Sequence, residues 1–444
     1  MPIDSHFEEF LNAEAYAHHL SKAEREAFVL ALNGLDAIAI AAQLDIRPEA
    51  VRQRLSQVYQ KFQIQGKGPV KLAKLQQLVQ SRYHDCQAIA PDADSCINFA
   101  CIPPRQDWGE APDLSVFYGR AAELQTLTEW ILEEKCRLIA LLGMGGIGKT
   151  ALSVKLAKQL EPEFDFIIWR SLRNSPPIEE FLADLLAFFC DPNTTDRSSD
   201  VAETISQILD YFRRFRCLLI LDDLEAILQP GDRYGRYQSG YEPYGDLLRR
   251  IGEIPHHSCA IALAQEKPRE ISLLASPSQS VRLLKLAGLE RSEAEKLLQE
   301  KQLTGSQSNW HQLIHDYRGN PLALRMVATT IQEVFNRNVD EYIECQTLLL
   351  SDLFIEILEQ QFNRLSPIQK EILLCLAKDS HPLSIQTLRE ALGTTIGTSE
   401  LIEHLEALSG RSLIETFKHQ HTHETLFTLQ PVINKYVKKY ARLP

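Results

Sequence analysis

The stretch from residue 138 to residue 150 carries the residue types and spacing that could do chemistry. It reads LIALLGMGGIGKT and fits the pattern G-x-x-x-x-G-K-[ST]. Glycines let successive backbone N–H groups wrap a β-phosphate, because no side chain blocks the approach. Lys149 would place its charge on the β- and γ-phosphates, and the Thr150 hydroxyl would ligate Mg²⁺. The spacing predicts a nucleotide phosphate site made by Gly143, Gly145, Gly146, Ile147, Gly148, Lys149, Thr150 and Ala151.

The residues on either side of this loop predict the elements that would hold it. The apolar run before it predicts a buried strand, and Leu152, Leu156, Ala157 and Leu160 after it lie on one face of a helix. That helix would start near Lys149 and add its unpaired N–H groups and the positive end of its dipole. A chance glycine turn is the alternative, and the regular pattern on both sides argues against it.

An acidic motif follows a second apolar run, in the stretch CLLILDDLE. The carboxyl end of a strand in a parallel sheet would bring these carboxylates beside the phosphate loop. We assign Asp222 to Mg²⁺ and Asp223 to orienting the attacking water, with Glu225 as the reserve candidate. A helix N-cap is the alternative reading of the pair. Two further runs, 164–172 and 258–264, predict more strands, and the second should lie next to the acidic strand.

Composition limits the class of protein. A length of 444 residues predicts two to four domains, and the formal net charge of −12 restricts any nucleic-acid contact to a local surface. We expect a cytoplasmic protein that does not enter a membrane, because the chain shows neither a long apolar run nor a leader pattern. The 9 cysteines lack C-x-x-C spacing, so they are expected to be reduced thiols.

Residues 20–82 predict a small helical unit with a basic helix that starts near Pro48. The segments LSKAE, NGL, AAQL and VRQRLSQVYQKF resemble the helix-turn-helix of LuxR-type regulators, and equally the small domain that heads many cyanobacterial signalling ATPases. Basic residues outnumber acidic ones here, which suits a DNA backbone. The same fold also serves as a protein interaction module, so both readings stay open. The side chains that would contact DNA are Arg52, Gln53, Arg54 and Lys61.

The second half of the chain predicts helices and then a winged helix. Beyond residue 283 the pattern is helical, with Gly319 and Pro321 interrupting it before another helix. From residue 352, helices capped by Ser366 and Ser384 precede two short strands, which is the element order of a winged helix. Residues 229–245 predict a surface loop to which we assign no function.

Motifs along residues 114–440 resemble those of the NB-ARC signalling ATPases. They are FYGR, GMGGIGKT, LLILDDLE, GNPLAL and FTLQP, in that order. The resemblance implies a switch that closes over ADP and opens on ATP to self-associate, with ATP/ADP and Mg²⁺ as cofactors. It also implies that Tyr118 and Arg120 contact adenine and that Pro321 contacts the base or ribose.

The expected fold is an α/β P-loop NTPase domain with a parallel sheet, flanked by all-α and winged-helix domains. The expected domains are a helix-turn-helix effector domain at 1–85, a linker at 86–113, a nucleotide-binding domain at 114–282, a helical domain at 283–350 and a winged-helix domain at 351–444.

Three features depart from the family pattern. Gln265 stands where relatives commonly carry an arginine that senses the γ-phosphate, so ATP hydrolysis is expected to be weak. Gln430 stands where many relatives carry a histidine beside the ADP β-phosphate, and it can still donate a hydrogen bond. The sequence ends after the expected winged helix, whereas such proteins usually continue into repeats, so the sensor is expected to be another protein or absent.

Three classes of function remain open from the sequence. The first is an ATP-dependent switch with an unidentified sensor or effector protein as its partner, the second a nucleotide-gated DNA-binding transcriptional regulator, and the third a P-loop enzyme with a small-molecule substrate. The trailing helical and winged-helix patterns favour the first two, because they add no further catalytic constellation.

Overall fold

The computed structural model describes Leu11, Ala15 and residues 20–441, with gaps at 33–34, 36, 45, 63, 65–68, 89–104, 115, 190–199, 277–278, 380, 394–395 and 419–423. Backbone alone is described at Lys22, 69–70 and 81–88. The chain forms two compact units, the first chiefly up to Arg105 and the second chiefly from Gln106 onward.

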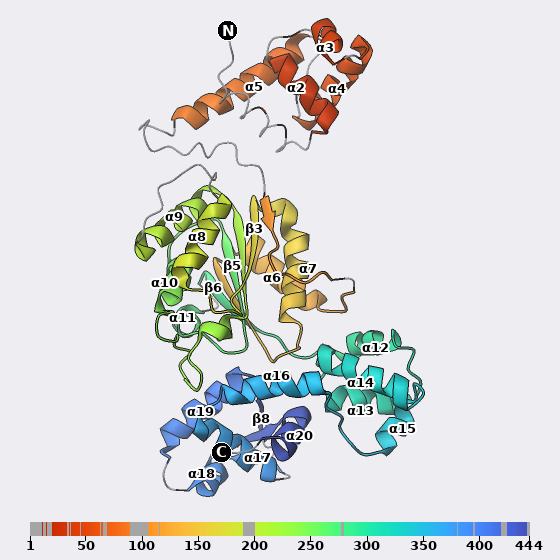
Figure 1. The fold of residues 1–444 in the computed structure, drawn as a ribbon, viewed down its shortest axis with the longest axis vertical. Coiled ribbons are helices and arrows are strands. Elements are labelled where there is room, and N and C mark those ends of the chain that lie inside the picture. Colours follow the sequence, from red (N-terminus) through yellow and green to blue (C-terminus); the bar gives the residue numbers. More distant parts are fainter. Residues whose placement is uncertain are drawn as a thin grey trace. The chain divides into compact units, whose positions relative to one another are not determined.

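The first unit is a set of helices (Figure 1) that enclose two small clusters of buried apolar side chains. Their bounds are α2 Lys22–Leu32, α3 Ala37–Gln43, α4 Pro48–Lys61 and α5 Pro69–Ala88. Ser21 and Glu24 exchange side-chain-to-backbone hydrogen bonds of 2.7 and 3.3 Å, the capping box that begins α2. Phe28 of α2 stacks on Phe62 at the end of α4, with ring centroids 5.3 Å apart. The sequence did not predict α5, which continues to Ala88.

The second unit is built on a six-stranded sheet in the order β1-β3-β4-β5-β2-β6. The strands are β1 Arg105–Asp107, β2 Leu138–Leu142, β3 Phe166–Ser171, β4 Cys217–Asp222, β5 Cys259–Ala264 and β6 Val281–Lys285. All pairings among β2 to β6 are parallel, and β5 lies directly between β2 and the acidic strand β4. The predicted parallel sheet is confirmed. The sequence missed β6, which spans the expected domain boundary at 282.

Helices cover both faces of this sheet, with α6 and α7 on one side and α8, α9 and α10 on the other (Figure 1). They are α6 Ala121–Leu132, α7 Lys149–Leu160, α8 Ile178–Phe189, α9 Val201–Arg214, α10 Glu242–Glu253 and α11 Arg269–Leu274, with short 3₁₀ turns at Glu161–Glu163 and Leu224–Ile227. The central strands β2, β4 and β5 are buried along their whole length. This is why they read as unbroken apolar runs rather than alternating ones.

A helical region follows the sheet, and its helices are α12 Arg291–Gln299, α13 Gln307–Asp316, α14 Pro321–Val334 and α15 Val339–Glu344. Pro321 stands at the first turn of α14, where its missing N–H costs nothing. The Asn320 side chain caps this helix by accepting from the backbone of Leu322 and Ala323.

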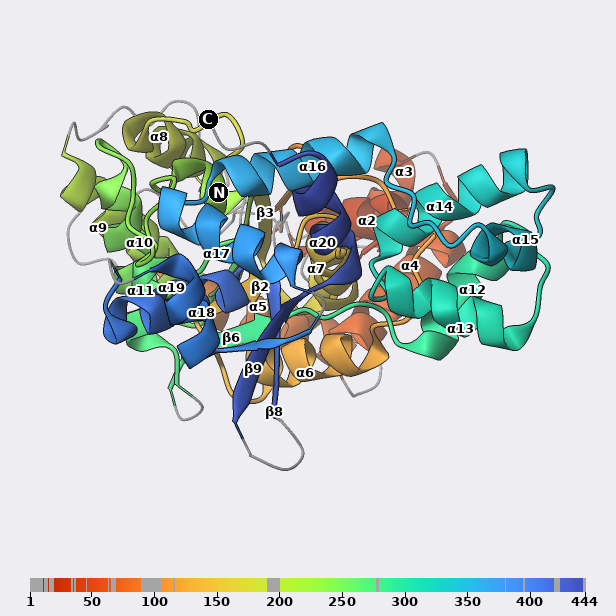
Figure 2. The same ribbon diagram turned by 90° about the horizontal axis from the view of Figure 1, so that it is seen from below.

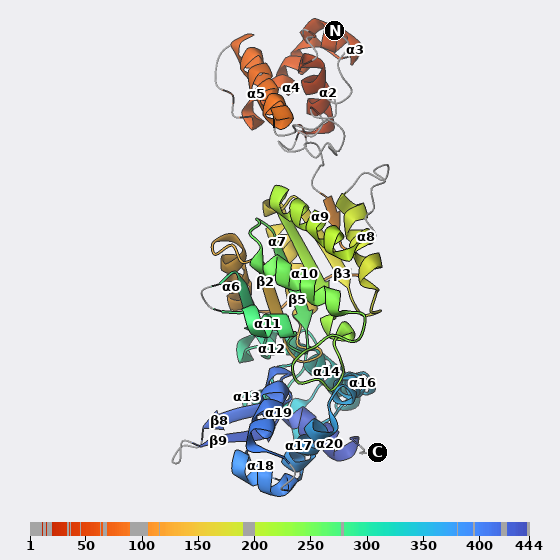
Figure 3. The ribbon, with the colours of Figure 1, turned by 90° about the vertical axis from the view of Figure 1, so that its left-hand side faces the viewer.

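The C-terminal region combines helices with a small antiparallel sheet in the order β7-β9-β8 (Figure 2). Its elements are α16 Asp352–Asn363, α17 Pro367–Lys378, β7 Leu383–Ser384, α18 Ile385–Leu392, α19 Thr398–Gly410, β8 Ile414–Lys418, β9 Thr425–Leu429 and α20 Pro431–Lys439. Ser366 and Ser384 cap α17 and α18, which confirms both predicted caps. Figure 3 shows β8 and β9 side by side near α19. Within the described residues, no helix is long and apolar enough to cross a membrane.

Ser258 should be a stability determinant of the sheet. Its buried Oγ accepts from the Cys217 N–H at 2.9 Å and lies 2.9 Å from the Phe215 carbonyl, to which it can donate, so it joins the start of β4 to the end of α9. Ser258→Ala leaves that N–H without a partner and should lower the free energy of unfolding by about 1–3 kcal/mol. Thermal melts measure the loss. The exposed Ser272→Ala serves as control, and equal melting of the two variants would contradict this role.

Candidate functional site

The loop 143–148 leaves the buried end of β2 and turns into α7 at Lys149. The Lys149 ammonium folds back onto the loop, where it donates to the Gly143 carbonyl at 2.9 Å and the Met144 carbonyl at 3.4 Å. Burial lowers the pKa of Lys149, and Glu225 is the strongest of the carboxylates that oppose this shift. The Lys149 ammonium therefore lies against the backbone carbonyls of the phosphate loop.

The predicted Mg²⁺ pair lies together. Thr150 Oγ1 donates to Asp222 Oδ2 at 2.9 Å, across the gap between α7 and the end of β4. Burial raises the pKa of Asp222, and the neighbouring Asp223 raises it further, while the Thr150 hydroxyl acts in the opposite direction. A hydroxyl and a carboxylate are oxygen ligands of the type that Mg²⁺ prefers, so these residues fit the ion that the sequence predicted.

Asp223 and Glu225 have different surroundings. The Asp223 carboxylate accepts from Arg173 Nε at 3.1 Å and from Ser171 Oγ at 3.4 Å, so it is turned toward the end of β3. Glu225 is buried, and its Oε2 accepts from the Gln265 N–H at 3.1 Å. Burial raises the pKa of Glu225, and Lys149 opposes that shift more than any other group. Glu225 therefore interacts more strongly with the Lys149 ammonium than Asp223 does.

A cavity of about 310 Å³ opens beside the loop. It is lined by Pro112, Leu114, Val116, Phe117, Tyr118, Arg120, Gly146, Ile147, Gly148, Lys149, Thr150, Ala151, Leu289, Leu297, Pro321, Leu322 and Arg325. Its volume lies at the lower end of the range of small-ligand pockets. The structure therefore brings the predicted adenine residues and the predicted phosphate residues to one cavity.

Arg120 and Tyr118 are already engaged in this cavity wall. The buried Arg120 guanidinium donates to the Ile147 carbonyl at 3.1 Å and pairs with Glu123 at 2.7 Å. Tyr118 donates its hydroxyl proton to Glu300 at 3.1 Å, which joins the FYGR segment to the helical region. Arg120 therefore supports the phosphate loop from outside as well as lining the cavity.

The residues that cover the loop were not predicted from the sequence. Asn320 Nδ2 donates to the Gly145 carbonyl at 3.1 Å. A Cβ on Gly145 would lie 2.4 Å from Ile357 of α16, and one on Gly146 would lie 2.8 Å from Leu322 of α14. The two glycines therefore leave room for α14 and α16. The signal for Asn320 was readable, because asparagine before proline is an N-cap pattern, whereas nothing near residue 357 pointed to the loop.

Gln265 and Gln430 lie at the ends of elements rather than in the cavity wall. Gln265 follows β5, and its Nε2 lies 3.9 Å from the place that a Cβ on Gly145 would occupy. Gln430 precedes α20 without a side-chain cap hydrogen bond. Among the described residues around the 310 Å³ cavity, neither glutamine is present.

The four candidate DNA contacts on α4 divide into two pairs. Lys61 forms an ion pair with Glu24 at 2.7 Å, and Arg54 NH1 donates to the Ala23 carbonyl at 3.5 Å. Arg52 and Gln53 are exposed. DNA contact by this helix stays a prediction, and it would compete with two contacts that hold α4 to α2.

Residues 120–227 match the family model of the NB-ARC domain. Together with the parallel sheet and the phosphate loop, this match confirms the resemblance to the NB-ARC domain for this segment. The likeness to LuxR-type regulators stays a prediction.

Two curated relatives extend the comparison. The chain is 43% identical over 348 residues to an uncharacterised WD repeat-containing protein of Nostoc sp., a match that covers 76% of this chain and 27% of the relative. It is 31% identical over 99 residues to a probable disease resistance protein of Arabidopsis thaliana, covering 22% of this chain and 12% of that protein. The chain therefore spans 27% or less of these relatives.

Two solved structures are also similar to the chain. One is a Walker-type ATPase of Pyrococcus abyssi, with 16% identity, a TM-score of 0.47 and coverage of 72% of this chain and 96% of that one. The other is a STAND protein with a tetratricopeptide repeat sensor from Pyrococcus horikoshii, with 16% identity, a TM-score of 0.40 and coverage of 76% and 44%.

Glu225 should make the nucleotide-free protein less stable as the pH rises. Its folded-state pKa is raised, so the folded chain gains stability from the protonated form and loses it as the pH climbs from the ordinary value of 4.5 through the raised value. Glu225→Gln cannot ionise, so its melting temperature should fall less steeply over this range. Melts at a series of pH values measure the slope. The exposed Glu333→Gln should keep the parental slope, and a parental slope in Glu225→Gln would show that the carboxylate is not strained by burial.

Proposed function

We propose that this chain is a signal-transduction switch of the NB-ARC type, in which ADP or ATP with Mg²⁺ sets how the helical and C-terminal regions pack on the sheet region. The observation that carries the proposal is the cover over the phosphate loop. Asn320 bonds to the Gly145 carbonyl and Ile357 packs against Gly145, so two later regions meet at the predicted phosphate site. A ligand at the phosphate site would contact or displace both the helical region and the C-terminal region.

The cavity explains how a nucleotide would act on this packing. Its wall combines the segment 112–120, the loop, and residues of the helical region such as Pro321 and Arg325. A ligand shifts an equilibrium only by its different affinity for the two states. A nucleotide that needs walls from two regions binds best when they are together, so ADP would stabilise the closed arrangement.

The proposed roles follow from these contacts. Thr150 and Asp222 hold Mg²⁺, which offsets phosphate charge when bound, and Lys149 exchanges the Gly143 carbonyl for phosphate oxygens. Pro321 lies against the base or ribose. Glu225 takes precedence over Asp223 as the carboxylate that orients water, because Asp223 is paired with Arg173.

The proposal also assigns roles to the regions of the chain that do not line the cavity. We assign residues 1–85 to a helix-turn-helix effector domain and residues 351–444 to a winged helix that opens with ATP and permits self-association. The Nostoc relative is named for WD repeats, so we propose that repeats of this kind, in the same polypeptide or in a partner, sense the signal. A nucleotide-gated DNA-binding regulator is the second candidate, supported by the exposed Arg52 and Gln53 on α4.

Lys149→Ala should nearly abolish nucleotide binding, because the variant loses both the charge that faces the phosphates and the bonds that shape the loop. ADP or ATP with Mg²⁺ at a thousand times the dissociation constant should stabilise the parent by about 4 kcal/mol, and the variant by almost nothing. Thermal melts measure this difference. Lys158→Ala, on the exposed side of α7, is the control, and a parent that melts identically with and without nucleotide would end the proposal.

Gln265→Arg should strengthen the response to ATP. An arginine at the end of β5 offers a charged fork where glutamine offers one neutral amide, and one charge-assisted hydrogen bond contributes about 1.5–3 kcal/mol. We expect slow hydrolysis in the parent and faster hydrolysis or more ATP-dependent assembly in the variant, measured by phosphate release and by solution mass. The exposed Gln299→Arg controls for added charge. Parental behaviour in both assays would show that residue 265 does not face the γ-phosphate.

A further inference from the structure

Glu266 is a buried carboxylate held by two arginines from the C-terminal region. Its side chain is 5% exposed. Oε1 accepts from Arg364 Nε at 2.6 Å, and Oε2 accepts from Arg411 NH2 at 3.0 Å. Arg364 directly follows α16 and Arg411 directly follows α19, so the ends of two separate helices place cations on one acid of the sheet region.

The same arginines also bond to the backbone of residues 228–232. Arg364 donates to the Leu228 carbonyl at 3.0 Å, and Arg411 donates to the Asp232 carbonyl at 3.1 Å. In return the Gly231 N–H donates to the Arg364 carbonyl at 2.8 Å. This segment was expected to be a surface loop without a function, and its start is instead bonded to the C-terminal region.

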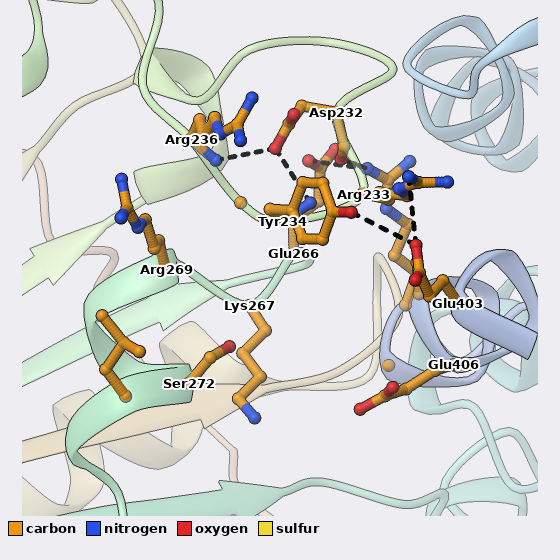
Figure 4. Close-up of a pocket in the computed structure, with 15 residues that line it drawn as sticks. Asp232, Arg233, Tyr234, Arg236, Glu266, Lys267, Arg269, Ser272, Glu403 and Glu406 are labelled. Carbon is orange, nitrogen blue, oxygen red and sulfur yellow. Dashed lines mark hydrogen bonds and ion pairs between the residues drawn. The ribbon is translucent and has the colours of Figure 1, made fainter. Parts of the chain in front are cut away.

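A cavity of about 390 Å³ lies beside these bonds, separate from the one at the phosphate loop (Figure 4). On its rim, Arg233 pairs with Glu403 of α19 at 3.0 Å, and the Tyr234 hydroxyl donates to the same carboxylate at 3.2 Å. These rim groups are partly exposed, so they contribute little beside the buried pairs. The buried acid and its two arginines are therefore the main polar connection here.

Glu266 is also directly linked to the phosphate site along the chain. The residue before it, Gln265, donates its N–H to Glu225, the strongest electrostatic partner of Lys149. One residue earlier, the Ala264 carbonyl accepts from the Gly143 N–H at 3.3 Å, at the start of the phosphate loop. The end of β5 thus contacts the phosphate site at 264 and 265 and the C-terminal region at 266.

We propose that Glu266, Arg364 and Arg411 form a latch that keeps the C-terminal region closed, and that nucleotide acts on this latch through the end of β5. The inference rests on the proposed function and adds its regulation. Buried charges are stabilised only while their partners stay in place, and after separation water solvates all three. Such a contact has two arrangements, closed or open, with no stable position between them.

The latch predicts faster ADP release when its charge balance is broken. Glu266→Gln removes the acid and leaves two cations together, so ADP should leave about tenfold faster, within the usual 5- to 150-fold range of coupling between sites. Release of a fluorescent ADP analogue measures the rate. Glu253→Gln is the matched control, since this exposed acid on α10 also pairs with an arginine, Arg249. A release rate equal to that of the parent would overturn the latch.

Two further measurements keep the test decisive. The double variant Glu266→Gln/Arg411→Gln removes both charges of one pair, so it should fold where the single variant fails, and it should also release ADP faster. Hydrogen exchange on the unmutated chain should show the Gly231 amide protected with ADP and exchanging at least tenfold faster with a non-hydrolysable ATP analogue. Equal protection in both would overturn the latch. A parent that gains no thermal stability from ADP would contradict the proposed function itself.

Discussion

The structure depends on a positive charge that is kept at the carboxyl edge of an apolar sheet. Lys149 lies where β2, β4 and β5 end, and burial lowers its pKa. Two loop carbonyls accept hydrogen bonds from this ammonium. Burial likewise raises the pKa of Asp222 and of Glu225. The Lys149 ammonium is therefore bonded to two loop carbonyls, and a phosphate would have to compete with these contacts.

That balance explains why the later regions matter. The loop carbonyls of Gly145 and Gly146 are bonded by Asn320 and the Leu322 N–H, so part of the loop is held by the helical region. The strand β5 carries the other connection, because Gln265 bonds to Glu225 and Glu266 bonds to the C-terminal arginines. Under the proposed function, these bonds are the connections through which a change at the phosphate site would reach both regions.

Local sequence patterns predicted what short-range physics determines. The unbroken apolar runs correspond to the buried strands β2, β4 and β5, and serine patterns marked the starts of α17 and α18. The short edge strand β6 has no clear period and was missed. The contacts of Glu225 with Gln265 and of Ile357 with Gly145 could not be predicted, because they join residues far apart in the chain. The order of preference between Asp223 and Glu225 likewise depended on Arg173, which lies in the turn after β3.

The close contact of Gly145 with Ile357 limits which substitutions the sequence can tolerate at both positions. Position 145 is constrained by its own backbone role and also by the volume of a side chain more than 200 residues away, because a Cβ there would lie 2.4 Å from Ile357. A bulkier residue at 357 has no space to take, since glycine is already the smallest neighbour. Residues 145 and 357 are therefore constrained together, and a recombinant whose residue 357 is larger than isoleucine would clash at this contact.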